Sequence, residues 1–171
     1  VSCLILSIGC GQKHENKSAA AEQNKSVSEK VAKNNTPQKP AARPNRPPGS
    51  TPAPDFTLAT TTGELVSMSD LRGKVILLNF WGTWCGPCRM ELPDFVKLYD
   101  KYNKDGLEIV GITIRRGESI KDVAKFQDQW GLNYLLLNDI NGNEVSEVTM
   151  AYSQAIGQMI NGIPTTLVID R

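Results

Sequence analysis

Apolar residues follow two different spacings in this chain, and the clearest change between them falls within residues 74–89. Residues 75–78 and Phe80 form a short apolar run, which predicts a strand buried on both faces. After a short turn, apolar residues recur at the spacing of one helical face: Leu92, Phe95 or Val96, Tyr99 and Tyr102. The pattern therefore predicts a helix that begins close to Cys85 and has Cys88 one turn in.

Shorter strands and helices alternate around this region. Residues 56–58 and 65–68, separated by a turn at Thr62-Gly63, predict a hairpin. The later elements are predicted as a strand over 107–114, a helix over 119–130, a strand over 134–137 and a helix with the apolar stripe Val145, Val148, Tyr152, Ile156 and Met159. We interpret this stripe as core rather than as a docking surface. The alternation predicts an α/β domain whose helices cover both faces of a central sheet.

The N-terminal segment has a different pattern. Residues 1–10 are apolar or small and uncharged, and ten residues are too few to cross a bilayer core. We interpret them as the end of a signal peptide, in which Gly9 precedes a lipidated Cys10 as in bacterial lipoproteins, although Ser7 stands where leucine is usual. Two alternatives remain, a longer membrane anchor and a cytoplasmic chain with an incidental apolar start.

Residues 11–52 are rich in Lys, Asn, Ser, Ala and Gln and then in Pro, so they have little to bury. This composition predicts a disordered tether with an average reach of roughly 35 Å. Residues 11–54 carry eight Lys or Arg against three acids, whereas residues 55–171 carry eleven against fifteen. A mildly acidic domain with a net charge of +1 for the whole chain argues against nucleic acid as a partner.

Two of the four cysteines lie in the sequence Trp84-Cys85-Gly86-Pro87-Cys88, and the other two lie in the N-terminal apolar segment. This distribution does not form a disulfide framework. Unpaired N–H groups and the helix dipole favour negative charge at a helix N-terminus, so we expect Cys85 to ionise more readily than a free thiol. A zinc site needs four thiolate or imidazole ligands, and the only histidine lies in the tether. We therefore expect a redox-active Cys85–Cys88 disulfide, without a metal or another cofactor.

These residues resemble a known family. The sequence NFWGTWCGPC is similar to the active site of thioredoxin-fold proteins. Four further motifs resemble its membrane-tethered extracytoplasmic branch, the TlpA/ResA-like thiol-disulfide oxidoreductases: Ala53-Pro54-Asp55-Phe56, Leu71-Arg72-Gly73-Lys74, Glu91-Leu92-Pro93 and Gly162-Ile163-Pro164-Thr165-Thr166. The resemblance covers roughly residues 53–170. It implies a thioredoxin-like fold in which a mixed sheet has an added N-terminal hairpin.

The sequence departs from this family at two places. The segment between Gly142 and Gly162 is longer than is usual for the branch. Family members continue past Asp170 through another strand and a final helix, so we expect the domain over residues 53–171 to be C-terminally truncated.

The resemblance also assigns roles to residues of the site. Cys85 attacks the partner disulfide and Cys88 resolves the mixed disulfide, which agrees with the exposed helix start that we expect for Cys85. The peptide bond between Ile163 and Pro164 is expected to be cis and to present backbone to a partner strand. Trp84 and the Gly86-Pro87 dipeptide are expected to support the dithiol.

Proton transfer is assigned to Glu91. Cytoplasmic thioredoxins have a buried aspartate in the strand before the dithiol, and Asn79 at the matching position here cannot titrate. Glu91 follows Cys88 by three residues, about one helical turn. The family has a glutamate there that affects the thiol pKa values, so we expect Glu91 to shuttle protons for Cys88. The alternative is an ordinary exposed helix residue.

The favoured function is a lipid-anchored bacterial enzyme that reduces disulfides of extracytoplasmic proteins, with apocytochrome c as the substrate that the resemblance suggests. Its partners would be protein disulfides, the membrane, and a membrane or extracytoplasmic electron donor. The alternatives are an oxidant or isomerase that makes disulfides, and a non-catalytic module that binds peptides at Pro164. A peroxidase is less favoured, because related peroxiredoxins carry a Thr-x-x-Cys site.

Overall fold

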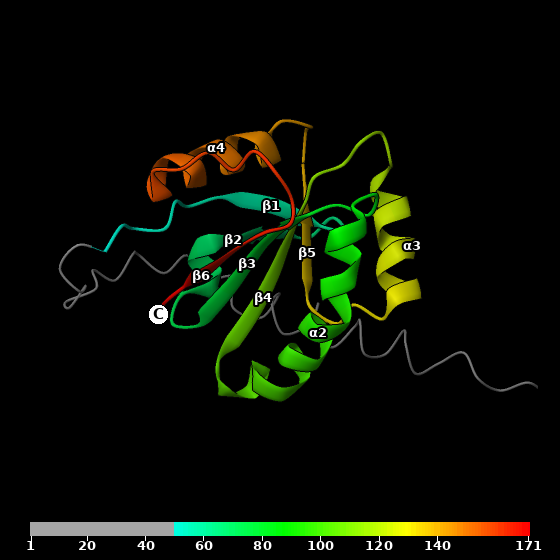
Figure 1. The fold of residues 1–171 in the computed structure, drawn as a ribbon, viewed down its shortest axis with the longest axis horizontal. Coiled ribbons are helices and arrows are strands. Elements are labelled where there is room, and N and C mark those ends of the chain that lie inside the picture. The colour runs from blue at the N-terminus through cyan, green and yellow to red at the C-terminus, as the bar shows by residue number, and fades with distance from the viewer. Residues whose placement is uncertain (1–49) are drawn as a thin grey trace, which may run out of the picture. The chain divides into compact units, whose positions relative to one another are not determined.

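A computed structural model describes residues 50–171, which fold around a six-stranded mixed sheet (Figure 1). The strand order is β2-β1-β5-β4-β3-β6, in which β3, β4 and β5 are parallel and the other pairings are antiparallel. The strands are β1 Thr57–Thr60, β2 Leu65–Ser67, β3 Val75–Trp81, β4 Leu107–Thr113, β5 Leu135–Asn138 and β6 Thr165–Ile169. The helices are α2 Gly86–Tyr102, α3 Ile120–Trp130 and α4 Glu144–Ile156, with short 3₁₀ turns η1 Met68–Leu71 and η2 Asn103–Asp105.

Helices cover both faces of the sheet, as the alternation of strands and helices predicts. Phe80 and Trp81 are neighbours on β3 and therefore point to opposite faces. The ring of Phe80 lies 6.1 Å from Tyr152 of α4, whereas the ring of Trp81 lies 5.6 Å from Phe126 of α3. Helices α2 and α3 accordingly lie on one side of the sheet and α4 on the other (Figure 1).

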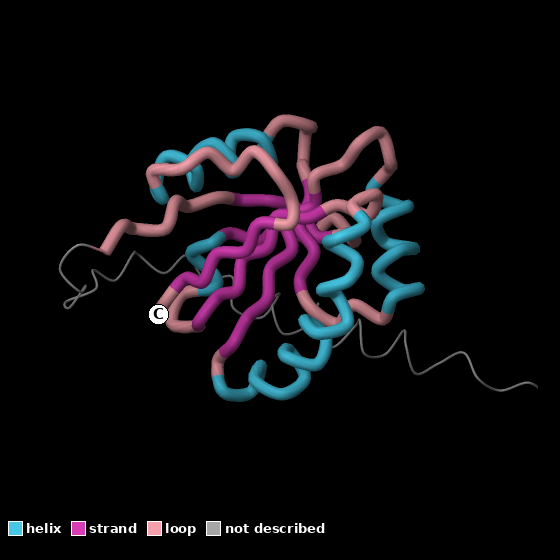
Figure 2. The backbone as a smooth tube through the Cα atoms, viewed as in Figure 1, coloured by secondary structure: helices cyan, strands magenta, loops and turns pink. Residues whose placement is uncertain are grey.

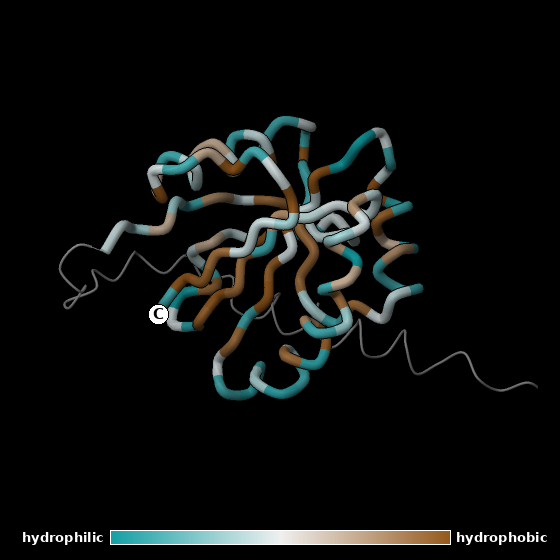
Figure 3. The backbone as a smooth tube through the Cα atoms, in the orientation of Figure 1, coloured by the Kyte–Doolittle hydropathy of each residue, from teal (hydrophilic) through white to brown (hydrophobic). Residues whose placement is uncertain are grey.

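The central strands form the core of the domain. Ile76, Leu78 and Phe80 of β3 are at most 1% exposed, so the prediction of a deeply buried strand here is confirmed. Hydrophobic residues concentrate on these strands, whereas the helices and loops are largely hydrophilic (Figure 3). The buried strands thereby fix the place from which α2 and its dithiol begin.

Helix α3 begins and ends where its local chemistry requires. Ser119 and Asp122 form a reciprocal cap, since each side chain accepts a hydrogen bond from the backbone N–H of the other. Gly131 ends the helix with a φ of 62°, a left-handed conformation that favours glycine. The prediction of a helix over 119–130 is confirmed to within one residue.

The apolar stripe predicted for α4 is only partly correct. Val145, Val148 and Tyr152 are buried, but Ile156 is 44% exposed and Met159 is 69% exposed. The helix ends at Ile156 because Gly157 adopts a φ of 67°. Met159 therefore lies in the loop after α4 and not on its buried face.

The predicted hairpin is confirmed and is part of the main sheet. Thr57 pairs with Ser67 across β1 and β2, and Gly63 in the connecting turn has a φ of 87°. Strand β1 also pairs with β5, which joins the hairpin to the sheet (Figure 2). Residues 1–49, including Cys10, the predicted signal segment and most of the predicted tether, lie outside the described residues.

Candidate active site

The Cys85–Cys88 pair lies where strand β3 leads into α2. Cys85 is the N-cap residue, and its Sγ atom accepts a hydrogen bond from the backbone N–H of Cys88 at 3.2 Å. The two cysteines form a disulfide with their Cα atoms 5.3 Å apart. Pro87 lies in the first helical turn, where its missing N–H removes no helical hydrogen bond. After reduction, the same N–H group and the helix dipole would stabilise a thiolate on Cys85.

Both cysteines are more enclosed than the sequence suggests. Cys85 is 5% exposed and Cys88 is 1% exposed, so the expectation that Cys85 is exposed is wrong, although Gly86 and Pro87 at the start of the helix are exposed. The reason is that Trp84 and Ile163 pack against the buried cluster to which both cysteines belong. Cys85 is still the more accessible of the two cysteines. This agrees with the expectation that Cys85 attacks and Cys88 resolves.

The loop before β6 lies against the dithiol. The peptide bond between Ile163 and Pro164 is cis, as the sequence motif predicts. The carbonyl oxygen of Ile163 lies 3.7 Å from Sγ of Cys85, although 78 positions separate the two residues in sequence. The fold thus brings the predicted partner-binding backbone to the first sulfur.

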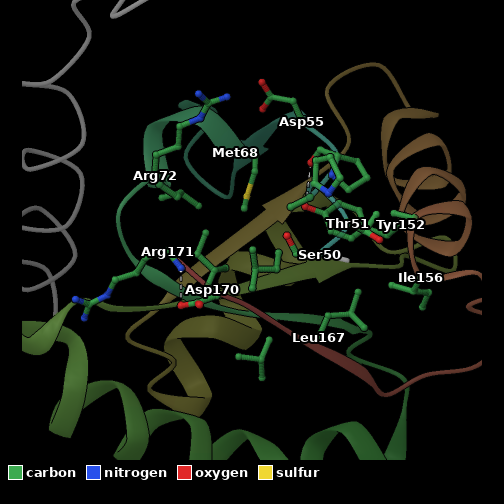
Figure 4. A pocket seen from close by; sticks show the side chains of 18 of the residues that line it. Ser50, Thr51, Asp55, Met68, Arg72, Tyr152, Ile156, Leu167, Asp170 and Arg171 are labelled. Carbon is green, nitrogen blue, oxygen red and sulfur yellow. Dashed lines mark hydrogen bonds between the residues drawn. The ribbon is translucent and has the colours of Figure 1, made fainter. Parts of the chain in front are cut away.

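Two hollows lie near this region of the domain. A small one of about 390 Å³ is lined by residues 156 and 158–165 with Leu167, including Ile163 and Pro164. A larger one of about 890 Å³ lies between the start of the domain, α4 and β6, and Figure 4 shows Tyr152, Leu167 and Arg171 among its lining residues. Neither hollow is lined by Cys85 or Cys88. The smaller one includes Ile163, whose carbonyl oxygen lies against Cys85, so it is the candidate substrate groove.

Trp84 is held in place by the loop that follows β4. Its indole N–H donates a hydrogen bond to the carbonyl oxygen of Ile114 at 2.9 Å. The guanidinium carbon of Arg116 lies 3.7 Å from the centre of the indole ring. Sequence analysis missed Arg116. Its position two residues after the predicted strand over 107–114 was the available signal, because the carboxyl ends of parallel strands meet at one edge of a sheet.

Asn79 and Glu91, the two residues considered for proton transfer, have different environments. Asn79 is 2% exposed and donates a hydrogen bond through Nδ2 to Oγ1 of Thr166 at 2.9 Å. Glu91 is half-buried, and its Oε2 atom is buried without a hydrogen-bond partner among residues 50–171. Burial raises the pKa of the Glu91 carboxyl above its usual value. The exchange of a proton between Glu91 and Cys88 stays a prediction.

Sequence analysis also missed Tyr134, which precedes β5 and belongs to the same buried cluster as both cysteines. Burial, followed by the charge of Glu91, raises the pKa of Tyr134 well above its usual range. The sequence around Tyr134 shows only an apolar strand pattern, and nothing in it indicates that Glu91 lies nearby.

Residues 50–171 match the sequence profile of the AhpC/TSA family. The chain belongs to this family. Among curated members, a protein named thiol-disulfide oxidoreductase ResA from Geobacillus kaustophilus (strain HTA426) is 40% identical over 123 residues, which is 72% of this chain and 63% of the relative. The thioredoxin-like protein YneN from Bacillus subtilis (strain 168) is 40% identical over 119 residues, which is 69% of this chain and 63% of the relative. This AhpC/TSA-family chain thus spans 63% of the length of both relatives.

A solved structure supports the same assignment. The crystal structure of a thiol:disulfide interchange protein of the thioredoxin family from Chlorobium tepidum TLS has a TM-score of 0.61 and 34% sequence identity. The match covers 77% of this chain and 81% of that protein. The predicted thioredoxin-like α/β fold and the family resemblance are both confirmed.

Proposed function

We propose that this domain is a thiol-disulfide oxidoreductase that reduces disulfides of partner proteins. The observation that carries the proposal is the Cys85–Cys88 disulfide at the start of α2, with the backbone of Ile163 against its first sulfur. The Trp-Cys-Gly-Pro-Cys sequence favours disulfide exchange over peroxide reduction, for which a Thr-x-x-Cys site is expected. The names of the ResA relatives and of the solved interchange protein support the same chemistry.

The reaction uses both cysteines and Glu91. The Cys85 thiolate attacks a partner disulfide, forms a mixed disulfide and releases one partner thiolate. The Cys88 thiol gives its proton to the Glu91 carboxylate and attacks Sγ of Cys85, which releases the second partner sulfur. Two electrons pass from the dithiol to the partner, and Cys85 and Cys88 end as the disulfide. Trp84 and the Gly86-Pro87 dipeptide shape the surface over which the partner disulfide approaches Cys85. An electron donor then returns the Cys85–Cys88 pair to the dithiol form.

We further propose that the enzyme acts outside the cytoplasm of a bacterium. The resemblance to the extracytoplasmic TlpA/ResA-like branch supports this location. Lipidation of Cys10 and the tether over residues 11–52 would attach the domain to the membrane, which would also bring it to a membrane or extracytoplasmic electron donor. Within residues 50–171, no helix combines the length and apolarity needed to cross a membrane. Apocytochrome c, whose haem-binding cysteines need reduction, is the first substrate to examine.

The proposal is tested by the redox potential of the pair, measured in a chain in which Cys3 and Cys10 are replaced by serine. We expect a value near the reducing end of the range for such enzymes, which runs from about −270 to about −120 mV. A value near −120 mV would instead assign the site to an oxidant. A Cys88→Ser variant is expected to accumulate mixed disulfides with partners, whereas the matched Cys85→Ser variant accumulates none.

A further inference from the structure

Arg116 presents a cation beside the active-site turn. Its guanidinium carbon lies 3.7 Å from the centre of the Trp84 ring, and the residue is exposed. Within residues 50–171, its side chain forms no ion pair and donates no hydrogen bond. A guanidinium that lies over an aromatic ring keeps the N–H groups at its edge free for a carboxylate. The ring of Trp84 therefore holds a set of donors next to the dithiol without occupying them.

The carboxylates close to Arg116 already have other partners. The two oxygens of Glu118 accept hydrogen bonds from the hydroxyl of Thr83 at 2.7 Å and from the backbone N–H of Arg116 at 2.6 Å. Asp139 pairs with Arg115, with 3.5 Å between Oδ2 and Nη2. Within the described domain, Arg116 is thus the cation of this loop that has no carboxylate partner.

The sheet places Arg116 and the candidate substrate groove on opposite sides of the dithiol. Strand β3, which leads to Cys85, lies between β4 and β6. Strand β4 is parallel to β3 and β6 is antiparallel, so β4 ends and β6 begins at the edge where β3 ends. The loop with Arg116 follows β4, and the loop with Pro164 precedes β6. Strands spaced by about 4.8 Å put β4 and β6 about 10 Å from each other.

A partner that is bonded to Cys85 crosses this edge of the sheet. An extended chain advances about 3.3 Å per residue, so about three residues span the distance between β4 and β6. The groove beside β6 is lined by no charged residue, which suits uncharged side chains. On the side of β4, Arg116 suits a carboxylate. The occupant of both places is therefore the polypeptide that flanks the partner's cysteine.

We propose that Arg116 is a specificity-determining residue that binds an Asp or Glu carboxylate within about three residues of the partner's cysteine. This inference rests on the proposed function, in which Cys85 attacks the partner disulfide. Arg116 makes no bond to sulfur, and the two electrons still pass from the dithiol to the partner. Exposed charges are screened beyond about 8 Å at physiological ionic strength, so at contact this local cation counts for more than the net negative charge of the domain.

The test compares synthetic peptide disulfides that differ in one residue. Each is a disulfide-linked homodimer with Asp or Asn two positions from its cysteine, before the cysteine in one pair of peptides and after it in the other. The enzyme is the reduced 171-residue chain with Cys3 and Cys10 replaced by serine. We expect a second-order rate constant about fivefold higher for Asp than for Asn in at least one placement. Added salt should reduce this preference.

Substitutions of Arg116 separate recognition from support of Trp84. Arg116→Gln should bring the ratio of the Asp and Asn rate constants to about one, and Arg116→Glu should bring it below one. A role in supporting Trp84 alone would slow both peptides equally and leave the ratio unchanged. Arg116→Lys keeps the charge without the planar fork and should retain part of the preference. The matched control is Lys121→Gln, which removes an exposed cation of α3 and should leave the ratio unchanged.

Absence of a preference for Asp in both placements, or an unchanged ratio in Arg116→Gln, would overturn the inference. An equal loss of preference in Arg89→Gln would do the same, because Arg89 is exposed one turn after Cys85 and is not held over Trp84.

Failure to reduce any of the peptides would refute the proposed function instead. The carboxylate site is then tested by NMR in the oxidised chain, with peptides that carry serine in place of cysteine. The signal of the Arg116 Nε–H should move on addition of the Asp peptide and not of the Asn peptide. An equal response to both peptides would contradict the site.

Discussion

Glu91 follows Cys88 by one turn of α2, and its ionisation is coupled to folding. Burial raises its pKa, so the folded state binds the proton more tightly than the unfolded state does. The resulting stability is fully present below the unfolded pKa and is lost as the pH rises through the raised folded pKa. In the proposed reaction the ionised form of Glu91 takes the proton of Cys88, so the form that this step requires is the one that folding disfavours.

Replacing Glu91 with Gln tests both sides of this connection. The resolving step should slow by about 100-fold, the lower end of a typical general acid–base contribution. The unmodified oxidised domain should lose stability between pH 4 and pH 7 as Glu91 ionises. The oxidised Glu91→Gln variant should lack that part of the loss. Rapid mixing with a model disulfide measures the first effect, and denaturant unfolding at both pH values measures the second. An equal loss of stability with rising pH in the unmodified domain and in the Glu91→Gln variant would contradict the burial of this carboxyl.

Asn79 has a structural role that an aspartate could not fill in the same way. Its side-chain N–H donates to Oγ1 of Thr166 and so joins the middle of β3 to β6. Asn79→Ala should lower the free energy of unfolding by about 1–3 kcal/mol. Thr166→Ala removes the other partner, and the double variant should cost less than the sum of the two single variants. Strict additivity in denaturant unfolding would show that this hydrogen bond contributes little.

The residues of the site differ in how well the sequence could predict them. Cys85, Cys88 and Glu91 share one helix, so their spacing alone predicts that they lie together. Pro164 was predicted from its motif. Arg116 and Tyr134 come near the dithiol only because β4 lies beside β3 and β5 lies beside β4, and no local pattern contains that information. The enclosure of Cys85 has the same origin, since Ile163 reaches it from a distant loop.

At the level of elements, the loop between β4 and α3 acts as a support for the active-site turn. It accepts the indole hydrogen bond of Trp84 at Ile114 and places Arg116 over the ring. Glu118 of the same loop accepts a hydrogen bond from the hydroxyl of Thr83 at 2.7 Å. The residues just before the dithiol are therefore fixed by a segment some thirty positions later in the chain.

Arg116→Ala should loosen this support without unfolding the domain. Loss of an exposed cation–π contact costs about 0.5–1 kcal/mol. Hydrogen exchange of the Trp84 indole N–H, followed by NMR, should become faster, since the ring loses the group above it. The control is Lys125→Ala, which removes an exposed cation from α3. Similar exchange rates in both variants would argue against the role of Arg116.

The elements themselves were largely predictable from the sequence because their boundaries are marked by local chemistry. The cap of Ser119 and the glycine at 131 enclose α3, and the turn glycine at 63 marks the hairpin. The end of α4 was missed because the apolar spacing continues to Met159, although the backbone leaves the helix at Gly157. Hydrophobic spacing alone therefore does not show at which residue a helix ends.

At the scale of the whole molecule, the disulfide is part of the core and not an addition to its surface. Cys85 and Cys88 belong to one buried cluster with Trp81, Leu92 and Val123, among others. Val123→Ala should therefore lower the stability of the domain by about 2 kcal/mol, since its side chain is fully buried. Thermal or denaturant unfolding of the oxidised and reduced forms measures the effect, and Lys121→Ala on the exposed side of α3 is the control.

Because the sulfurs share this cluster, folding and electron transfer form one thermodynamic cycle. Any substitution that destabilises the oxidised and reduced forms by different amounts must shift the redox potential by the same free-energy difference. For a two-electron couple, about 1.4 kcal/mol of such a difference equals about 30 mV. Packing residues that never touch a partner can therefore set the redox potential of the Cys85–Cys88 pair.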